Sequence, residues 1–145
     1  MKFSVGKILI SIIGLLLICG TWLADYNVTH VFKPDWPPHA KFHNGQTMFL
    51  GTFLGILTLV FLWSDFLRTT VVQKICLGAI TASLYWLALL GAYCIPGTAL
   101  IDPDLATGNW SSDNKQLYMA TVVLITIITG TFLELNRLKK NSALL

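Results

Sequence analysis

Four long apolar stretches, separated by short polar segments, dominate the hydropathy pattern of the chain. Each stretch approaches or exceeds the length of about 17–25 residues that an α-helix needs to cross the roughly 30 Å hydrocarbon core of a bilayer. The pattern therefore predicts an all-α fold, an integral membrane four-helix bundle that forms one transmembrane domain over residues 1–145. The predicted helices cover approximately residues 8–24, 38–63, 72–94 and 117–138.

Local signals mark several of the predicted helix ends. Pro37 and Pro38 precede the second stretch, where a missing N–H and a fixed φ suit the first helical turn. The sequence Ile95-Pro96-Gly97 ends the third stretch. A secretory signal peptide is disfavoured for the first stretch, because Trp22 stands where cleavage after Ala24 would require a small residue. We therefore expect an uncleaved first helix.

The composition supports a membrane environment. The chain is 54% hydrophobic and 12% charged, whereas soluble domains contain roughly 25% charged residues. The net charge of +3 requires no nucleic-acid partner, because the basic residues lie where membrane topology would place them. Cys19, Cys76 and Cys94 show no CxxC spacing, and we interpret them as small buried hydrophobic residues.

The distribution of lysine and arginine predicts the orientation of the bundle, because basic flanks favour the cytoplasmic side of a membrane. Seven of the ten basic residues flank the termini or the short link between the second and third helices. We therefore expect both termini in the cytoplasm and two long segments, about 25–38 and 95–116, on the outer side. The seven residues are Lys2, Lys7, Arg68, Lys74, Arg137, Lys139 and Lys140, and the other three are Lys33, Lys41 and Lys115.

The sequence leaves the type of membrane open. A multi-pass protein of a bacterial inner membrane and one of a eukaryotic endomembrane would both show this pattern. Two Asn-x-Ser/Thr sequons, at Asn27 and Asn109, fall in the predicted outer segments, but such tripeptides are weak signals of glycosylation.

All three histidines lie within fourteen residues of one another, in the segment that leads into the second predicted helix. His39 and His43 are four residues apart and therefore share a helix face. Since polar groups in a bilayer need partners or water, we expect this face to point into the bundle. The same face continues through Gln46, Thr47, Leu50 and Leu54.

Three interpretations of the histidines stay open at this point. They could be structural, hydrogen-bonded to carbonyl groups of the proline-rich loop. His39 and His43 could share a metal ion, with Asp25 or His30 completing the site. Alternatively, one histidine could act as an acid or base on a lipophilic substrate, oriented by Asp25.

The sequence predicts an outer-side cavity that binds, and could transform, a lipophilic small molecule. Whether the protein is an enzyme, and which cofactor it uses, stay open. The alternative is an accessory or assembly subunit of a larger membrane complex, with a membrane protein or a second copy as partner. The candidate catalytic residues are His39, His43 and Asp25, and the candidate ligand-binding residues are His30, Trp36, Asn44 and Gln46.

Small residues predict close helix packing. Gly51 and Gly55 form a GxxxG pattern in the second helix, and Gly78 and Ala82 have the same spacing in the third. We expect these patterns to hold the bundle together, with self-association as the less favoured alternative.

Other polar and aromatic residues are given structural roles. Tyr85 and Trp86 are interpreted as core residues, although they could line a pocket. Glu134 and Arg137 are three residues apart and are expected to pair on the surface. Asp102, Asp104 and Asp113 are spaced too irregularly for a calcium loop and are expected to be solvated.

One segment resembles a family signature. The signature consists of Thr29-His30 followed by WPPHAKFHNGQT, residues 36–47, and it resembles that of a family of small, functionally uncharacterised four-span membrane proteins. The overall layout is also similar to DoxX-like proteins and to the sterol-isomerase and sigma-2-receptor group. The first resemblance implies the four-span fold, and the second implies a lipophilic ligand enclosed by helices. Neither assigns a catalytic role to a residue of this chain.

Overall fold

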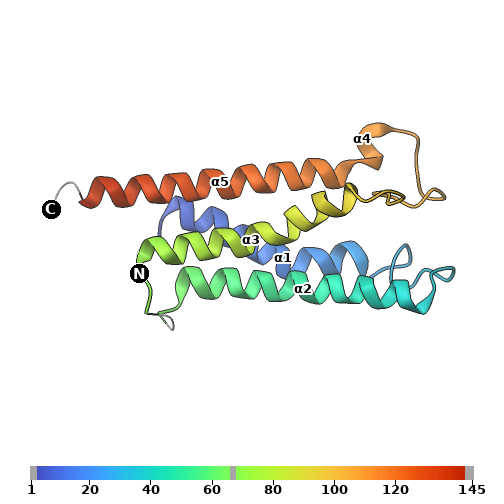
Figure 1. Cartoon of the computed structure of the whole chain (residues 1–145), viewed down its shortest axis with the longest axis horizontal. Coiled ribbons are helices and arrows are strands. Elements are labelled where there is room, and N and C mark those ends of the chain that lie inside the picture. Colours follow the sequence, from blue (N-terminus) through green and yellow to red (C-terminus); the bar gives the residue numbers. More distant parts are fainter. Residues whose placement is uncertain (1–2, 66–67, 143–145) are drawn as a thin grey trace.

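The computed structural model describes residues 3–65 and 68–142, and this part of the chain is helical with connecting loops. Four long helices, α1 (Val5–Asp25), α2 (Pro38–Trp63), α3 (Val71–Tyr93) and α5 (Lys115–Ser142), lie side by side (Figure 1). A single-turn helix, α4 (Trp110–Asp113), precedes α5. The four long helices are all long and apolar enough to cross a membrane, which confirms the predicted number of candidate spans.

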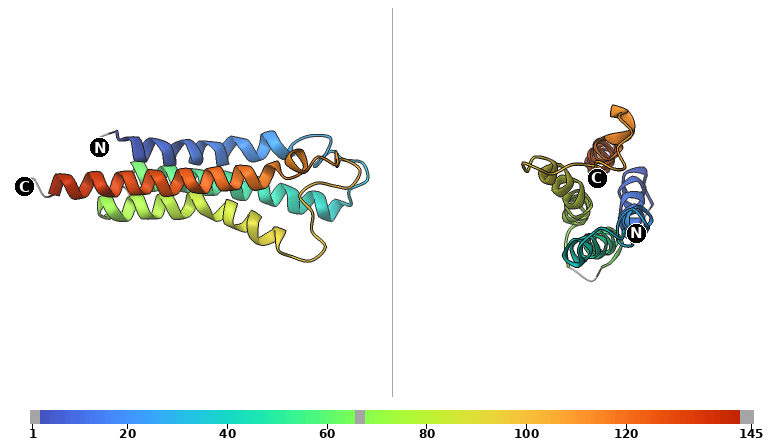
Figure 2. Two further views of the ribbon diagram at one scale, coloured as in Figure 1. Left: turned by 90° about the horizontal axis from the view of Figure 1, so that it is seen from above. Right: turned by 90° about the vertical axis from the view of Figure 1, so that its right-hand side faces the viewer.

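The helices alternate in direction, so the two ends of the bundle differ. Both termini and the α2–α3 link lie at one end, which we call the terminal end (Figure 1). The segments 26–37 and 94–109 lie at the other, which we call the loop end. α1 packs against α2 and α5, and α3 also packs against α2 and α5, which closes a ring of four helices (Figure 2). This is the up-down-up-down arrangement of a four-helix bundle.

The helix bounds match the prediction for α2 and differ elsewhere. α1 begins at Val5 and α5 ends at Ser142, because a helix continues beyond its apolar stretch wherever polar residues can keep the backbone hydrogen bonds. α3 starts one residue early, after Thr70, whose side chain forms a capping box with Gln73. The short helix α4 was not predicted, and Asn109 caps it by accepting two backbone N–H bonds.

Glycine residues bring α1 and α2 into close contact. A methyl group at Gly55 would lie 2.4 Å from the carbonyl oxygen of Gly14, and one at Gly51 would lie 2.6 Å from the Thr21 side chain. A larger residue does not fit at either position without a shift of the helices. The packing role predicted for this GxxxG pattern is therefore confirmed.

The α2–α3 contact repeats this pattern with different residues. A methyl group at Gly78 would lie 2.8 Å from the side chain of Leu62, and Ala82 is fully buried. The hydroxyl groups of Thr58 and Thr81 are hydrogen-bonded at 2.9 Å across the same interface. The predicted flat surface on α3 is confirmed. Trp86 is buried in the core and Tyr85 packs against it, as expected for core residues.

The contact with α1 also fixes how α2 is rotated about its axis. Its buried face contains Met48, Gly51, Leu54, Gly55, Thr58 and Leu62. At 100° per residue, His39, His43 and Gln46 lie roughly 90–150° around the helix from the centre of that face. All three are exposed. The expectation that the histidine face points into the bundle was therefore wrong for every member of that face except Leu54.

The terminal end of the bundle buries charged side chains. Glu134 is 1% exposed, Lys7 4% and Lys74 7%. Arg137 donates from Nε to Glu134 at 3.2 Å, so the predicted pair exists. The pair was predicted to lie on the surface, which was wrong for Glu134. Gly6 lets the first turn of α1 cover this carboxylate, since a methyl group at Gly6 would lie 2.9 Å from Glu134 Cβ.

The two buried lysines have different partners. Lys74 donates to the carbonyl oxygen of Ser64 at 2.8 Å and forms an ion pair with Asp65. The ammonium group of Lys7 lies 3.7 Å from the centre of the Trp63 ring, which is a cation–π contact. At the terminal end, Lys7 therefore links α1 to α2, and Lys74 links α3 to the residues that follow α2.

The cysteines do not occupy the buried positions that we expected. Cys19 and Cys94 are exposed, and Cys76 is partly exposed. Cys19 lies on the outer face of α1, and Cys94 follows the last residue of α3 at the loop end. A small apolar residue on a helix that faces lipid need not be buried in protein, so hydropathy alone could not decide this point.

Replacing Gly55 by alanine is expected to destabilise the bundle by roughly 1–3 kcal/mol, because the added methyl group would overpack the α1–α2 contact. Gly45, on the same helix, has no atom within 4 Å of an added methyl group. Gly45→Ala is therefore the matched control and should be neutral or stabilising by up to about 1 kcal/mol. Unfolding of both variants in a denaturing detergent checks this, and equal stability would contradict the packing.

Candidate functional site

A polar network at the loop end is centred on Asp25, the last residue of α1. Asn44, in the second turn of α2, donates from Nδ2 to Asp25 Oδ2 at 2.8 Å. His30 Nε2 lies 3.9 Å from Asp25 Oδ1. The Asp25 side chain is only 18% exposed. Three of the sequence-predicted site residues are thus brought together, and we call them the Asp25 network.

The segment after α1 orients His30 toward Asp25. The Thr29 hydroxyl lies 2.8 Å from His30 Nδ1. Asn27 Oδ1 in turn accepts hydrogen bonds from the backbone N–H and the hydroxyl of Thr29, at 2.8 and 2.6 Å. With Nδ1 engaged in this local turn, Nε2 is the ring nitrogen that faces the carboxylate.

The Asp25 network has one unused acceptor. Asn44 Oδ1 is buried and accepts no hydrogen bond within the described part of the chain. A buried amide oxygen without a partner is costly unless water or a ligand supplies one. Asn44 Oδ1 is therefore a buried acceptor on the amide that also binds the Asp25 carboxylate.

A second set of contacts joins the two long loop-end segments. Lys33 Nζ donates to Asp102 Oδ2 at 2.7 Å and to Asp104 Oδ1 at 3.0 Å. The indole of Trp36 donates to the same Asp102 oxygen at 3.0 Å. We call Lys33, Trp36, Asp102 and Asp104 the loop clasp. The expectation that the two aspartates are only solvated was wrong, because residues far apart in sequence supply their partners.

The loop clasp connects to the Asp25 network through Trp36. The rings of Trp36 and His30 meet edge to face with centroids 5.5 Å apart. Hydrogen bonds from Lys33 and Trp36 hold the pKa of Asp102 below its usual value of 3.8. Hydrogen bonds to Asp102 and Asp104 raise the pKa of Lys33 above its usual value of 10.5. Lys33 and Asp102 therefore both keep their charges over the whole physiological pH range.

The other predicted site residues form a separate pair on the outer face of α2. His39 and His43 approach each other with their Nε2 atoms 3.0 Å apart. His43 Nδ1 lies 3.1 Å from Gln46 Oε1. Within the described residues, no hydrogen bond or ion pair links this pair to Asp25 or His30. The candidate catalytic set of His39, His43 and Asp25 is thus divided between two places in the structure.

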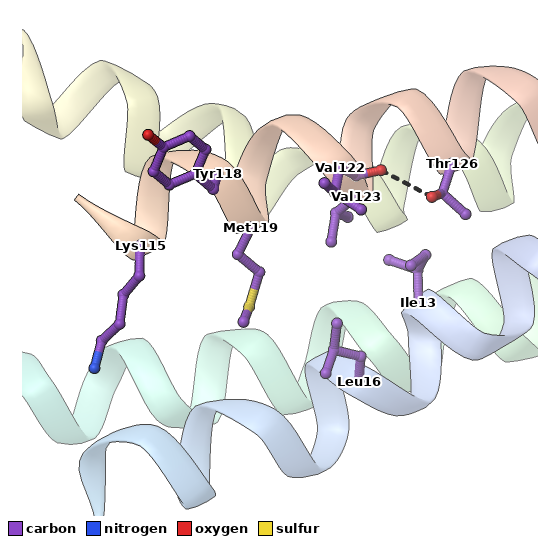
Figure 3. Close-up of a pocket in the computed structure, with 8 residues that line it drawn as sticks. All are labelled: Ile13, Leu16, Lys115, Tyr118, Met119, Val122, Val123 and Thr126. Carbon is purple, nitrogen blue, oxygen red and sulfur yellow. Dashed lines mark hydrogen bonds between the residues drawn. The ribbon is translucent and has the colours of Figure 1, made fainter. Parts of the chain in front are cut away.

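Sequence reasoning missed a groove between α1 and α5 in the loop-end half of the bundle (Figure 3). Its volume is about 470 Å³. Met119 of α5 points across it toward α1, and Leu16 of α1 points back. Apart from Lys115 and Tyr118 at its loop end, its walls are largely apolar. The lining residues are Ile13, Leu16, Lys115, Tyr118, Met119, Val122, Val123 and Thr126.

The sequence contains little signal for this groove, because its two walls are about a hundred residues apart. The one local hint is Lys115, a cation two residues before the last predicted apolar stretch. The Thr126 hydroxyl donates to the carbonyl of Val122 at 2.8 Å (Figure 3). The hydrogen bond of this hydroxyl is therefore made within α5. The inner part of the groove stays apolar.

Asp102→Asn is expected to lower the melting temperature slightly at pH 7, because it removes a partly exposed charge pair. Since folding lowers the pKa of Asp102, its contribution is present above the unfolded value of 3.8 and is lost as the pH falls through the lower folded value. The difference from the wild type should therefore vanish in strong acid. Asp35→Asn, in the same segment and exposed, is the control and should change nothing. A constant difference at all pH values would contradict the clasp.

The comparisons place the chain in a family. The family model of DUF6640, described as a family of unknown function, matches residues 9–143. No curated protein and no solved structure matches the chain. The resemblance of its layout to DoxX-like proteins and to the sterol-isomerase and sigma-2-receptor group stays a prediction. Since the match covers nearly the whole chain, including both loop-end segments, the protein belongs to the DUF6640 family of unknown function.

Proposed function

We propose that the protein crosses the membrane four times and binds an anionic lipophilic molecule in the groove between α1 and α5. The observation that carries this proposal is an apolar groove with a lysine at one end. The expectation of a lipophilic ligand is kept, but its site moves from the histidines to the groove. No reaction is assigned, because His39 and His43 lie apart from Asp25.

The proposed orientation puts both termini in the cytoplasm. Of the basic residues that the structure describes, six lie at the terminal end and three at the loop end. One of the latter, Lys33, is paired with Asp102 and Asp104. Such an asymmetry favours the cytoplasm for the terminal end. The six are Lys7, Arg68, Lys74, Arg137, Lys139 and Lys140.

The dimensions of the groove suit a single apolar chain. The groove has a volume of about 470 Å³ and is open along one side, so a bound chain would keep one side exposed. Along α5 it extends from Lys115 to Thr126, roughly 16 Å at 1.5 Å per residue. That is about half of the 30 Å hydrocarbon core of a bilayer. The groove therefore matches one chain lying in the leaflet on the loop-end side.

Electrostatics favour a negatively charged head group. Lys115 is exposed and forms no ion pair with any residue in the described ranges. It is also the first residue of α5, where the helix dipole adds partial positive charge. The nearest acidic residue in sequence, Asp113, accepts hydrogen bonds from Thr107 and from the Gly108 N–H. These bonds lower the pKa of Asp113 and direct its charge into its own loop.

Lys115→Gln is expected to weaken the binding of palmitate by about tenfold, the loss of one charge-assisted contact. It should leave the binding of hexadecanol, which has the same chain and no charge, unchanged. Equilibrium binding of labelled ligand to the purified protein in a mild detergent measures both. Lys41→Gln, at the same end of the bundle on α2, is the matched control.

A second variant tests the apolar part of the groove. Val122→Trp fills it and should reduce the binding of both compounds. Ile125→Trp, at a similarly exposed position of the same helix that does not line the groove, should not. Equal binding by all variants would contradict the proposal. Copurification with a larger membrane protein in place of lipid would instead favour the alternative of an accessory subunit.

The proposed orientation is tested by a native cysteine. Cys94 is exposed at the loop end, so in a variant carrying Cys19→Ser and Cys76→Ser it should be shielded from a membrane-impermeant maleimide in sealed vesicles whose cytoplasmic face is outward. Opening the vesicles with detergent should allow the labelling, and Cys94→Ser should abolish it. Labelling of Cys94 in the sealed vesicles would show the reverse orientation.

A further inference from the structure

His39 and His43 are arranged as a pair of metal ligands. Their Nε2 atoms are 3.0 Å apart and their ring planes cross at 80°. Two imidazole nitrogens bound to one tetrahedral ion, each at about 2.0–2.1 Å, lie about 3.3 Å apart. A small side-chain rotation therefore brings both nitrogens to a shared ion. Spacing by one helical turn keeps the two rings on the same face.

Gln46 prepares His43 for this role. The Gln46 carbonyl oxygen lies 3.1 Å from His43 Nδ1, and a carbonyl oxygen can only accept a hydrogen bond. The proton of neutral His43 is therefore on Nδ1, and the lone pair is on Nε2, facing His39. A metal-bound histidine usually donates its other ring N–H to an acceptor on a second residue, as His43 Nδ1 does to Gln46 here.

The metal-free and metal-bound forms of the histidine pair differ in the position of one proton, that of His39. Without metal, His39 donates its Nε2–H to the lone pair of His43. To bind an ion, His39 adopts its other neutral tautomer, with the proton on Nδ1, and both Nε2 lone pairs then point to the metal. Since His39 is exposed, water can exchange this proton. No net proton is gained or lost by the neutral pair.

We propose that His39 and His43 form a solvent-open, two-histidine site for a divalent transition metal such as Cu²⁺, Ni²⁺ or Zn²⁺. Imidazole suits these ions, whereas Mg²⁺ and Ca²⁺ prefer oxygen ligands. In the described ranges, no group of three or more His, Cys, Asp or Glu side chains is placed to hold an ion. The pair therefore supplies two ligands and leaves the remaining positions to water or to a further molecule.

The position of the site follows from the fold. The glycine contacts with α1 turn this face of α2 outward, so a hydrated ion can reach the pair from solution. Phe42 packs beside both rings, with centroid distances of 6.3 Å to His39 and 5.5 Å to His43. These contacts restrict the rotation of the two imidazoles. The inference does not depend on the groove between α1 and α5 and goes beyond the proposed function.

The test is equilibrium binding of Cu²⁺, Ni²⁺ and Zn²⁺ to the full chain, purified in detergent without a histidine tag. We expect one ion per chain and at least tenfold weaker binding in His39→Ala and in His43→Ala. His30→Ala removes the third histidine, which lies in the Asp25 network, and should leave the affinity unchanged. Circular dichroism verifies that each variant stays helical.

A positioning variant separates a built site from two adventitious histidines. Gln46→Leu removes the hydrogen bond to His43 Nδ1 without removing a ligand, and should weaken binding by about tenfold. Gln46→Glu keeps an acceptor at that atom and should restore it. The proposal is overturned if the double variant His39→Ala and His43→Ala binds as tightly as the wild type, or if His30→Ala loses binding to the same extent.

Discussion

The close approach of α1 to its neighbours at glycine residues determines the rest of this structure. Gly14 meets Gly55 of α2, and Gly6 meets Gly130 of α5, at separations where an added methyl group would lie 2.3–3.3 Å from atoms of the neighbouring helix. In a bilayer, helices gain no hydrophobic energy by leaving lipid for each other, so packing at small residues provides much of the association energy. Each glycine contact also fixes the rotation of the helix about its own axis, because only the face that carries the glycine lets the neighbouring backbone approach so closely.

Those rotations divide the polar residues of the bundle into buried and exposed sets. At the terminal end, the contact at Gly6 buries Glu134, and Lys7 is buried against the ring of Trp63. Buried charges within membrane helices are expensive and need partners. Arg137 of α5 is the partner of Glu134, and the indole of α2 is the partner of Lys7. At the terminal end, the contact of Lys7 with Trp63 therefore joins α1 to α2, whereas the Glu134–Arg137 pair lies within α5.

At the loop end, one continuous sequence segment is distributed over three environments. His30 turns back to Asp25, Trp36 reaches Asp102 in the other loop, and His39 and His43 lie on the outer face of α2. The three environments therefore differ in the kind of molecule that they can bind. The Asp25 network is largely shielded and leaves Asn44 Oδ1 unpaired within the described residues, whereas the histidine pair is open to solution. The groove beside α5 is apolar and ends at a lysine.

The sequence alone determined the number and the approximate limits of the candidate spans, because uninterrupted apolar runs of this length are rare outside membrane helices. It also identified the glycine faces and the i, i+4 relation of the two histidines, which are local consequences of helix geometry. It could not show which way α2 is turned, since that depends on Gly14 and Thr21 of another helix. Asp102 and its partners, and likewise the two walls of the groove, come from segments far apart in the sequence, so only the tertiary structure decided them.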